Sequence, residues 1–184
     1  MFDLQDFIAS CRRFAGAPDG AKQVLALMRS LLGDAEGIKQ AVTPSESGQA
    51  ILDAPLYRSA EVMILNATLH PHFASPPHEH GMWAVIGIYE GQENNTFYRR
   101  SGEGLDEVNR RELRAGDAIL LGSDVIHAIE NPLGSRTLGL HVYGGDLAAA
   151  RRSMWEPRSH RELPYDNSRF FQWCAERAGS RSVV

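Results

Sequence analysis

The chain contains very few cysteines. Among its 184 residues only Cys11 and Cys174 are cysteines, and each lies in a segment with a helical pattern. Two widely separated cysteines cannot form the disulfide framework that stabilises small secreted domains. We therefore expect a reducing, cytoplasmic location, with both thiols half-buried in the core rather than paired in catalysis.

The sequence also lacks an excess of positive charge and any long hydrophobic run. Its 19 basic and 23 acidic residues give a formal net charge of −4. Nucleic-acid binding needs a basic surface, so no nucleic-acid partner is expected. No apolar stretch approaches the roughly 20 residues that span a bilayer, and the first six residues contain no signal-peptide core. We therefore expect a soluble protein with no nucleic-acid or membrane partner. The sequence leaves a monomer and a homodimer both open.

The periodicity of apolar residues changes along the chain. Residues 4–14 and 24–32 place apolar side chains three and four positions apart, which predicts a pair of helices. Short strands separated by glycine-rich turns follow, which favours a closed or jelly-roll β architecture. A short helix is expected at residues 147–154 and another at 168–178. We therefore expect an all-β domain over residues 1–184, in three parts: a helical cover over 1–50, a β-barrel over 51–146 and a tail over 147–184.

The strongest chemical signal is the sequence Pro-Pro-His78-Glu79-His80, which begins an apolar run ending at Gly91. We expect this run to be one strand. Alternate residues of a strand face the same side, so His78 and His80 should project together and Glu79 away from them. Two imidazoles on one rigid face are the beginning of a metal site.

These motifs resemble those of a known superfamily. The His-x-His pair and the later Gly116-Asp117 with His127 look like the two conserved motifs of the cupins. Within that superfamily the chain is similar to the cysteine dioxygenase group of small thiol dioxygenases. The further points of similarity are the pairs Tyr57-Arg58 and His141-Val142-Tyr143. The resemblance extends over roughly residues 55–146 and implies a double-stranded β-helix that holds one mononuclear iron.

The resemblance also implies which residues bind the metal. The generic cupin motif has a glutamate three or four residues beyond the second histidine, where this chain has Ala84 and Val85. Glu90 lies about 30 Å away if the strand is straight. The implied ligands, as in the thiol dioxygenases, are His78, His80 and His127. Three imidazoles leave the ion with its full positive charge, so it favours an anionic ligand such as a thiolate. Imidazoles alone do not select iron over zinc or nickel.

Other site residues follow from the same resemblance. Tyr143 is expected to face the substrate, with His141 orienting its hydroxyl group. The serine that completes this relay in the family is Gly139 here, so His141 must find a water or another partner. No cysteine lies near His80, and Tyr143 should therefore be an unmodified phenol. Arg58 is the candidate for holding a substrate carboxylate, because a guanidinium group grips carboxylates in a fixed fork.

Simpler roles stay open for several of these residues. His141 and Tyr143 could form a hydrogen-bonded pair in the core, and Arg58 could be a salt-bridged surface residue. Asp124 is either a turn residue or a group that orients a metal ligand. A second His-x-His pair lies in a loop around a proline and is expected at a rim without binding metal: His70 and His72.

The leading hypothesis is an Fe(II)-dependent dioxygenase that uses O₂ to oxidise a small carboxylate-bearing thiol to its sulfinate. Candidate substrates are cysteine, mercaptopropionate and mercaptosuccinate. Tyr143 and His141 would be catalytic, and Arg58 would bind substrate. Two alternatives stay open. One is a metal-dependent cupin enzyme with a different small-molecule reaction, and the other is a non-catalytic cupin that binds a metal or ligand.

Overall fold

Three N-terminal helices cover one side of the molecule. The computed structural model describes residues 1–42, 55–102 and 104–179. The first described range folds into three helices: α1 (Leu4–Ala15), α2 (Gly20–Leu31) and α3 (Ala35–Ala41). The carboxylate of Asp3 caps α1 by accepting hydrogen bonds from two backbone N–H groups in its first turn. The boundary expected between residues 50 and 51 lies outside the described residues.

The strands form two antiparallel sheets. The first has the order β1-β2-β9-β4-β7. Its strands are β1 (Tyr57–Arg58), β2 (Met63–Leu69), β4 (Ala84–Glu90), β7 (Ala118–Leu121) and β9 (Thr137–Tyr143). The second has the order β11-β10-β3-β8-β5-β6. Its strands are β3 (His78–Glu79), β5 (Gln92–Ser101), β6 (Gly104–Arg114), β8 (Ile126–Glu130), β10 (Ser153–Trp155) and β11 (Glu162–Pro164).

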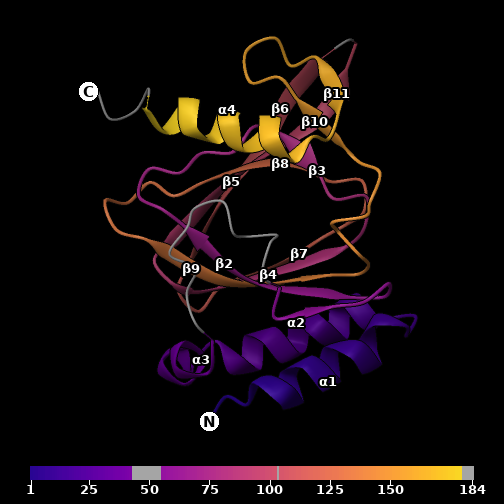
Figure 1. The fold of residues 1–184 in the computed structure, drawn as a ribbon, viewed down its shortest axis with the longest axis vertical. Helices are drawn as coiled ribbons and strands as arrows, with labels where there is room; N and C mark the ends of the chain where they lie inside the picture. The colour runs from indigo at the N-terminus through magenta and orange to yellow at the C-terminus, as the bar shows by residue number, and fades with distance from the viewer. Residues whose placement is uncertain (43–54, 103, 180–184) are drawn as a thin grey trace.

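The two sheets face each other around the barrel interior. Figure 1 shows α1 to α3 beneath the first sheet and α4 (Asn167–Gly179) above the second. The predicted fold class, an all-β architecture of antiparallel strands with helices at both ends, is confirmed.

The first sheet is buried on both faces, and every residue of its strands β2 and β9 is buried. On β9, alternate residues such as Val142 pack with the N-terminal helices, while Tyr143 packs toward the barrel interior. Helix α2 approaches closely because Gly87 has no side chain: a Cβ atom there would lie 2.6 Å from Met28 Cγ. This layering leaves the inward-facing side chains of the first sheet opposite those of the second.

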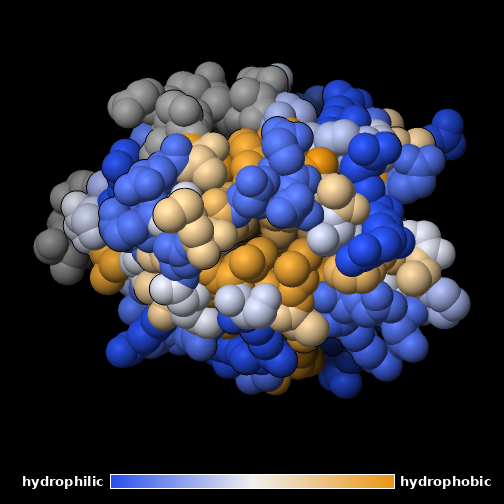
Figure 2. Space-filling view, turned by 90° about the horizontal axis from the view of Figure 1, so that it is seen from below, coloured by the Kyte–Doolittle hydropathy of each residue, from blue (hydrophilic) through white to orange (hydrophobic). Residues whose placement is uncertain are grey.

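The outer helices present a mixed surface. Figure 2, which views the molecule from the side of α1 to α3 in Figure 1, shows apolar side chains in the middle of this face with hydrophilic ones around them. Several leucines of these helices are half-buried members of the cluster on the first sheet: Leu4, Leu25, Leu27 and Leu31. Within the described ranges, no helix is both long enough and apolar enough to span a membrane.

The run from His78 to Gly91 is not one strand, contrary to expectation. Strand β3 ends at Glu79, and β4 begins at Ala84 in the opposite sheet. Gly81 has a φ of 71°, in the left-handed region that favours glycine, and it lies in the turn between the two sheets. His80 therefore follows the end of β3 instead of continuing a long strand.

The tail also differs from expectation. The helix expected at residues 147–154 is absent, and β10 begins at Ser153. Strand β10 pairs with β3, and Met154 lies opposite His78. The helix expected near the end of the chain is confirmed as α4. The tail thus completes the second sheet next to the His-x-His motif.

Both cysteines are free, and they are more buried than expected. Cys11 packs among the N-terminal helices, and Cys174 lies on the buried face of α4. Burial raises the pKa of each thiol to about 12. Because the thiolate is the reactive form, thiols in such surroundings are inert.

Candidate metal centre

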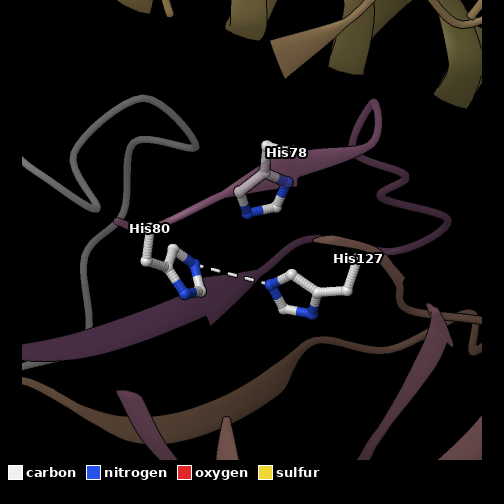
Figure 3. Close-up of side chains that lie close together, drawn as sticks. All are labelled: His78, His80 and His127. Carbon is white, nitrogen blue, oxygen red and sulfur yellow. Dashed lines mark hydrogen bonds between the residues drawn. The ribbon is translucent and has the colours of Figure 1, made fainter. Parts of the chain in front are cut away.

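Three buried histidines lie together inside the barrel. His78 on β3 is directly opposite His127 on β8 in the strand ladder, and His80 follows β3. One ring nitrogen from each lies within 4.8 Å of the other two. Figure 3 shows the three rings grouped together, with a nitrogen of His80 directed at one of His127. The structure thus brings together the three predicted metal ligands in a group that could hold a metal ion.

Hydrogen bonds fix the tautomer of two of these rings. Nδ1 of His78 lies 3.0 Å from the carbonyl oxygen of Pro76. Nδ1 of His127 lies 2.8 Å from Oδ1 of Asn95. Both oxygens can only accept, so each Nδ1 carries the proton and each Nε2 is left with a free lone pair. Metal-binding histidines are oriented in this way by partners of their other nitrogen.

The spacing of the rings also fits an ion. The Nε2 atoms of His80 and His127 are 3.4 Å apart. Two nitrogens bound to one tetrahedral ion at about 2.0–2.1 Å would be about 3.3–3.4 Å apart. The donor set and its spacing therefore fit a divalent metal ion held by imidazoles.

Burial keeps the three imidazoles neutral. Burial, and secondarily the charge of Arg152, lowers the pKa of His78 to about 3. Burial and the neighbouring imidazoles hold the pKa of His80 and His127 well below its ordinary value. Neutral imidazole is the form that binds metals. Glu90 is not part of the histidine group. The strand is not straight as expected, and the carboxylate of Glu90 pairs with Lys39 instead.

A small cavity opens beside the histidines. Its volume is about 60 Å³, and most of its wall is apolar, with Leu69, Ile86 and Phe170 among the lining residues. At roughly 10–15 Å³ for each water, this is room for about four to six water-sized groups. No carboxylate from the described ranges lines the cavity. Its ionisable groups, besides the three histidines, come from His141, Tyr143, Arg152 and Tyr165.

Tyr143 and His141 both line this cavity. Nδ1 of His141 lies 3.1 Å from the Tyr143 hydroxyl oxygen. The Tyr143 ring meets the ring of His80 edge to face, with 5.1 Å between centroids. Burial raises the pKa of Tyr143 and lowers that of His141 to about 4. At neutral pH, Tyr143 therefore keeps its proton and His141 is uncharged.

Two residues that the sequence analysis did not consider extend this network. Glu93 and Asn95 are both buried on β5. Nδ2 of Asn95 donates a hydrogen bond of 2.8 Å to Oε1 of Glu93. Oε2 of Glu93 lies 3.9 Å from Nε2 of His141. The available signal was the alternation after Gly91, because two polar residues at inward positions of a strand must pair inside the barrel.

Arg58 does not line this cavity. Its guanidinium group forms a two-pronged ion pair with Asp146, with a shortest distance of 2.9 Å, and its side chain is 47% exposed. Asp124 is also exposed, and the partner of His127 is Asn95 instead. His70 and His72 are not part of the three-histidine group.

Arg152 supplies the cation of the cavity. This residue is only 8% exposed. Its guanidinium group stacks on Tyr165, and Nη1 donates a hydrogen bond of 3.4 Å to the carbonyl oxygen of Glu79. Nε has no hydrogen-bond partner, and no carboxylate from the described ranges pairs with the group. Nothing in the sequence distinguishes Arg152 from the neighbouring Arg151, so sequence analysis missed it.

No family model matches the chain. It is similar to the solved structure of a cupin superfamily protein from Desulfitobacterium hafniense, with 20% identity over 50% of this chain and 75% of that one and a TM-score of 0.42. It is also similar to a Klebsiella pneumoniae protein with a double-stranded β-helix domain, with 16% identity over 64% of this chain and 87% of that one and a TM-score of 0.46. A third similar structure is a DMSP lyase from Ruegeria pomeroyi, with 21% identity over 55% of this chain and 46% of that one and a TM-score of 0.43. The structural neighbours are thus cupin and double-stranded β-helix proteins, and at these identities the likeness concerns the fold alone.

Proposed function

We propose that this protein is an Fe(II)-dependent dioxygenase that oxidises a small thiol carboxylate to its sulfinate with O₂. One observation carries the proposal: a single small cavity is lined both by three neutral histidines and by a buried guanidinium group. The first feature suits a metal that binds sulfur, and the second suits a carboxylate.

The donor set favours an anionic substrate atom. Three imidazoles contribute no negative charge, so a bound divalent ion attracts a thiolate and deprotonates the thiol that supplies it. Ferrous iron held by His78, His80 and His127 would supply positions at which the sulfur and dioxygen meet. Imidazole ligands suit zinc and nickel as well, so the identity of the metal is itself part of the proposal.

Arg152 takes the role that the sequence analysis assigned to Arg58. Its guanidinium group is buried beside an apolar wall without a carboxylate partner, and such a group left unpaired is costly. A substrate carboxylate provides the planar acceptor that matches it. The unpartnered Nε of Arg152 supports this role.

The cavity narrows the choice of substrate. Cysteine carries an ammonium group, and no carboxylate from the described residues lines the cavity to receive it. Mercaptosuccinate carries two carboxylates, whereas Arg152 is the one arginine in the described lining. A volume of about 60 Å³ also favours the smallest candidate. We therefore favour 3-mercaptopropionate or a thiol of similar size with one carboxylate.

Tyr143 would act on the substrate or on dioxygen through its hydroxyl group. Its raised pKa keeps the hydroxyl proton in place at neutral pH, so the group can donate a hydrogen bond into the cavity. The reaction is balanced without another reductant: the thiol and one O₂ together contain every atom of the sulfinic acid.

The test is oxygen consumption with a panel of thiols. Protein loaded with Fe(II) under anaerobic conditions is mixed with oxygenated buffer and 3-mercaptopropionate, cysteine or mercaptosuccinate. Propionate, which lacks the thiol, is the substrate control, and zinc-loaded protein is the metal control. We expect one sulfinate for each O₂ consumed, both oxygen atoms derived from O₂, and the fastest turnover with 3-mercaptopropionate. No sulfinate from any thiol would refute the activity.

A further inference from the structure

The buried carboxyl group of Glu93 has no role in the proposed function. Glu93 is 0% exposed on β5, and its ladder partner on β6 is the apolar Leu113. Oε1 accepts a hydrogen bond from Asn95, but Oε2 has no hydrogen-bond partner. Nε2 of His141 has none either, and the two atoms lie 3.9 Å apart. Each of these two buried atoms therefore lacks a hydrogen-bond partner, and each is placed near the other.

The strand that carries His141 leaves this side of the ring open. A Cβ atom at Gly139 would lie 3.2 Å from Nε2 of His141. A side chain at this position would therefore meet the imidazole edge, and glycine provides none. The carboxyl group of Glu93, from the opposite sheet, lies 3.9 Å from this edge.

The positions of the protons connect Glu93 to the cavity. At 3.9 Å, Oε2 of Glu93 and Nε2 of His141 are not hydrogen-bonded, and a small shift of either side chain would bring them together. If Glu93 is ionised, Nε2–H of His141 would then donate to it, and Nδ1 would accept the hydroxyl proton of Tyr143. If Glu93 is protonated, its O–H donates to Nε2, and the His141 proton sits on Nδ1 and donates to the Tyr143 oxygen. The Tyr143 hydroxyl then points its own proton into the cavity.

We propose that Glu93 is a positioning residue that selects the tautomer of His141 and so sets the direction of the Tyr143 hydroxyl proton. A transfer along this chain is balanced. Tyr143 releases its proton into the cavity and takes the Nδ1 proton of His141, which takes the proton of Glu93. The net change is one proton delivered and one carboxylate formed.

The same carboxyl group also orients a metal ligand through Asn95. Because Nδ2 of Asn95 donates to Glu93, Oδ1 must face Nδ1 of His127. One side chain thus holds both the Tyr143 relay and the tautomer of His127.

The surroundings of Glu93 allow both its protonated and its ionised form to be populated near neutral pH. Burial raises its pKa to about 7, and the hydrogen bond from Asn95 opposes this only in part. The titratable groups that face it are His141 and Tyr143 on β9. The β6 strand contributes only Leu113 at this position, and no charged side chain from the described ranges pairs with Glu93.

The test is NMR of ¹⁵N-histidine in the zinc-loaded protein, in which long-range ¹H–¹⁵N spectra report the proton position on each ring. In the wild type we expect the His141 proton on Nδ1 at about pH 6 and on Nε2 at about pH 8.5. In Glu93→Gln the amide keeps its oxygen toward Asn95 and donates to Nε2. His141 should then keep its proton on Nδ1 at both pH values. Glu112→Gln makes the same atomic change on the outside of the barrel and should behave as the wild type.

Two outcomes overturn the proposal. One is a wild-type His141 tautomer that does not change over this pH range, a result that needs no variant to be folded. The other is a Glu93→Gln protein in which the tautomer still changes with pH.

A second test measures activity and rests on the proposed function. We expect Glu93→Gln to oxidise 3-mercaptopropionate at least about tenfold more slowly at saturation, with its KM and iron content unchanged. If the wild type oxidises no thiol, the proposed function fails, and the NMR result still decides the role of Glu93.

Discussion

The guanidinium carbon of Arg152 lies 3.3 Å from the centre of the Tyr165 ring. Arg152 precedes β10, and Tyr165 lies between β11 and α4. Stacking on an aromatic face holds a guanidinium plane in a fixed orientation. The C-terminal segment, expected only to follow the barrel, therefore supplies both the cation of the cavity and its support.

Replacing Arg152 should weaken substrate binding specifically. In Arg152→Met the carboxylate loses a charge-assisted partner worth about 1.5–3 kcal/mol. This corresponds to a rise in KM of about 10- to 160-fold for 3-mercaptopropionate. Steady-state oxygen consumption measures this rise, and the iron content should be unchanged.

Arg58→Met is the matched control for that substitution. Its guanidinium group pairs with Asp146 at the surface, so removing it should leave KM within about twofold of the wild type. If Arg58→Met raises KM and Arg152→Met does not, the carboxylate binds at the arginine that the sequence analysis favoured.

Removing one histidine of the group should abolish stable metal binding. We expect His80→Ala to retain less than about a tenth of the wild-type metal after dialysis against a weak chelator. Elemental analysis measures this content. His72→Asn is the control, because this exposed residue has a φ of 60° that asparagine tolerates. Equal metal content in wild type and His80→Ala would show that the three rings do not form the site.

Asn95 should control metal affinity without touching the metal. In Asn95→Leu, Nδ1 of His127 loses the acceptor that fixes its tautomer. Loss of such a partner typically weakens binding about 10- to 100-fold. Competition with a chromophoric chelator would measure the change for zinc. An unchanged affinity would mean that the orientation of His127 depends on packing alone.

The metal-free protein should lose stability in mild acid. His78 and His141 have pKa values of about 3 and about 4 in the folded protein, against 6.5 ordinarily. Their contribution is complete above pH 6.5 and is lost as the pH falls toward these values, because the unfolded chain binds protons that the folded chain cannot. Each contributes a slope of about 1.4 kcal/mol per pH unit.

The contribution of Glu93 to stability changes with pH in the opposite direction, because its pKa is raised from 4.5 to about 7. Its contribution is complete below pH 4.5 and is lost as the pH rises through 7. Urea unfolding with chelator present, at several pH values, measures the sum. His141→Gln should reduce the acid slope by about 1.4 kcal/mol per pH unit, and His72→Asn should not. A free energy of unfolding that is flat from neutral to acid pH would contradict this account.

The sequence predicts the metal site better than the pocket around it. His78 and His80 are recognisable because their spacing is local, and His127 because it follows a glycine-rich turn in a known motif. Arg152 carries no such pattern, and Glu93 carries only the alternation of its strand. Their significance comes from burial without a charge partner, which depends on contacts between residues distant in the chain.

The break between β3 and β4 was missed for a similar reason. The residues from Ala84 onward read as a continuation of the strand that begins at His78, because both segments are extended and rich in β-forming residues. Gly81, with its positive φ, lies in the short turn that separates them, and a single glycine in a strand pattern is an ambiguous signal.

Strand β3 is only two residues long, with its two ladder pairs to β8 joining His78 to His127 and Glu79 to Ile126. So short a strand has few backbone hydrogen bonds to resist local opening. An ion shared by His78 and His127 would crosslink the two strands across the very pair where they meet. Dissociation of the ion and fraying of β3 would then be one event, and amide hydrogen exchange at Glu79 would report the lifetime of the bound metal.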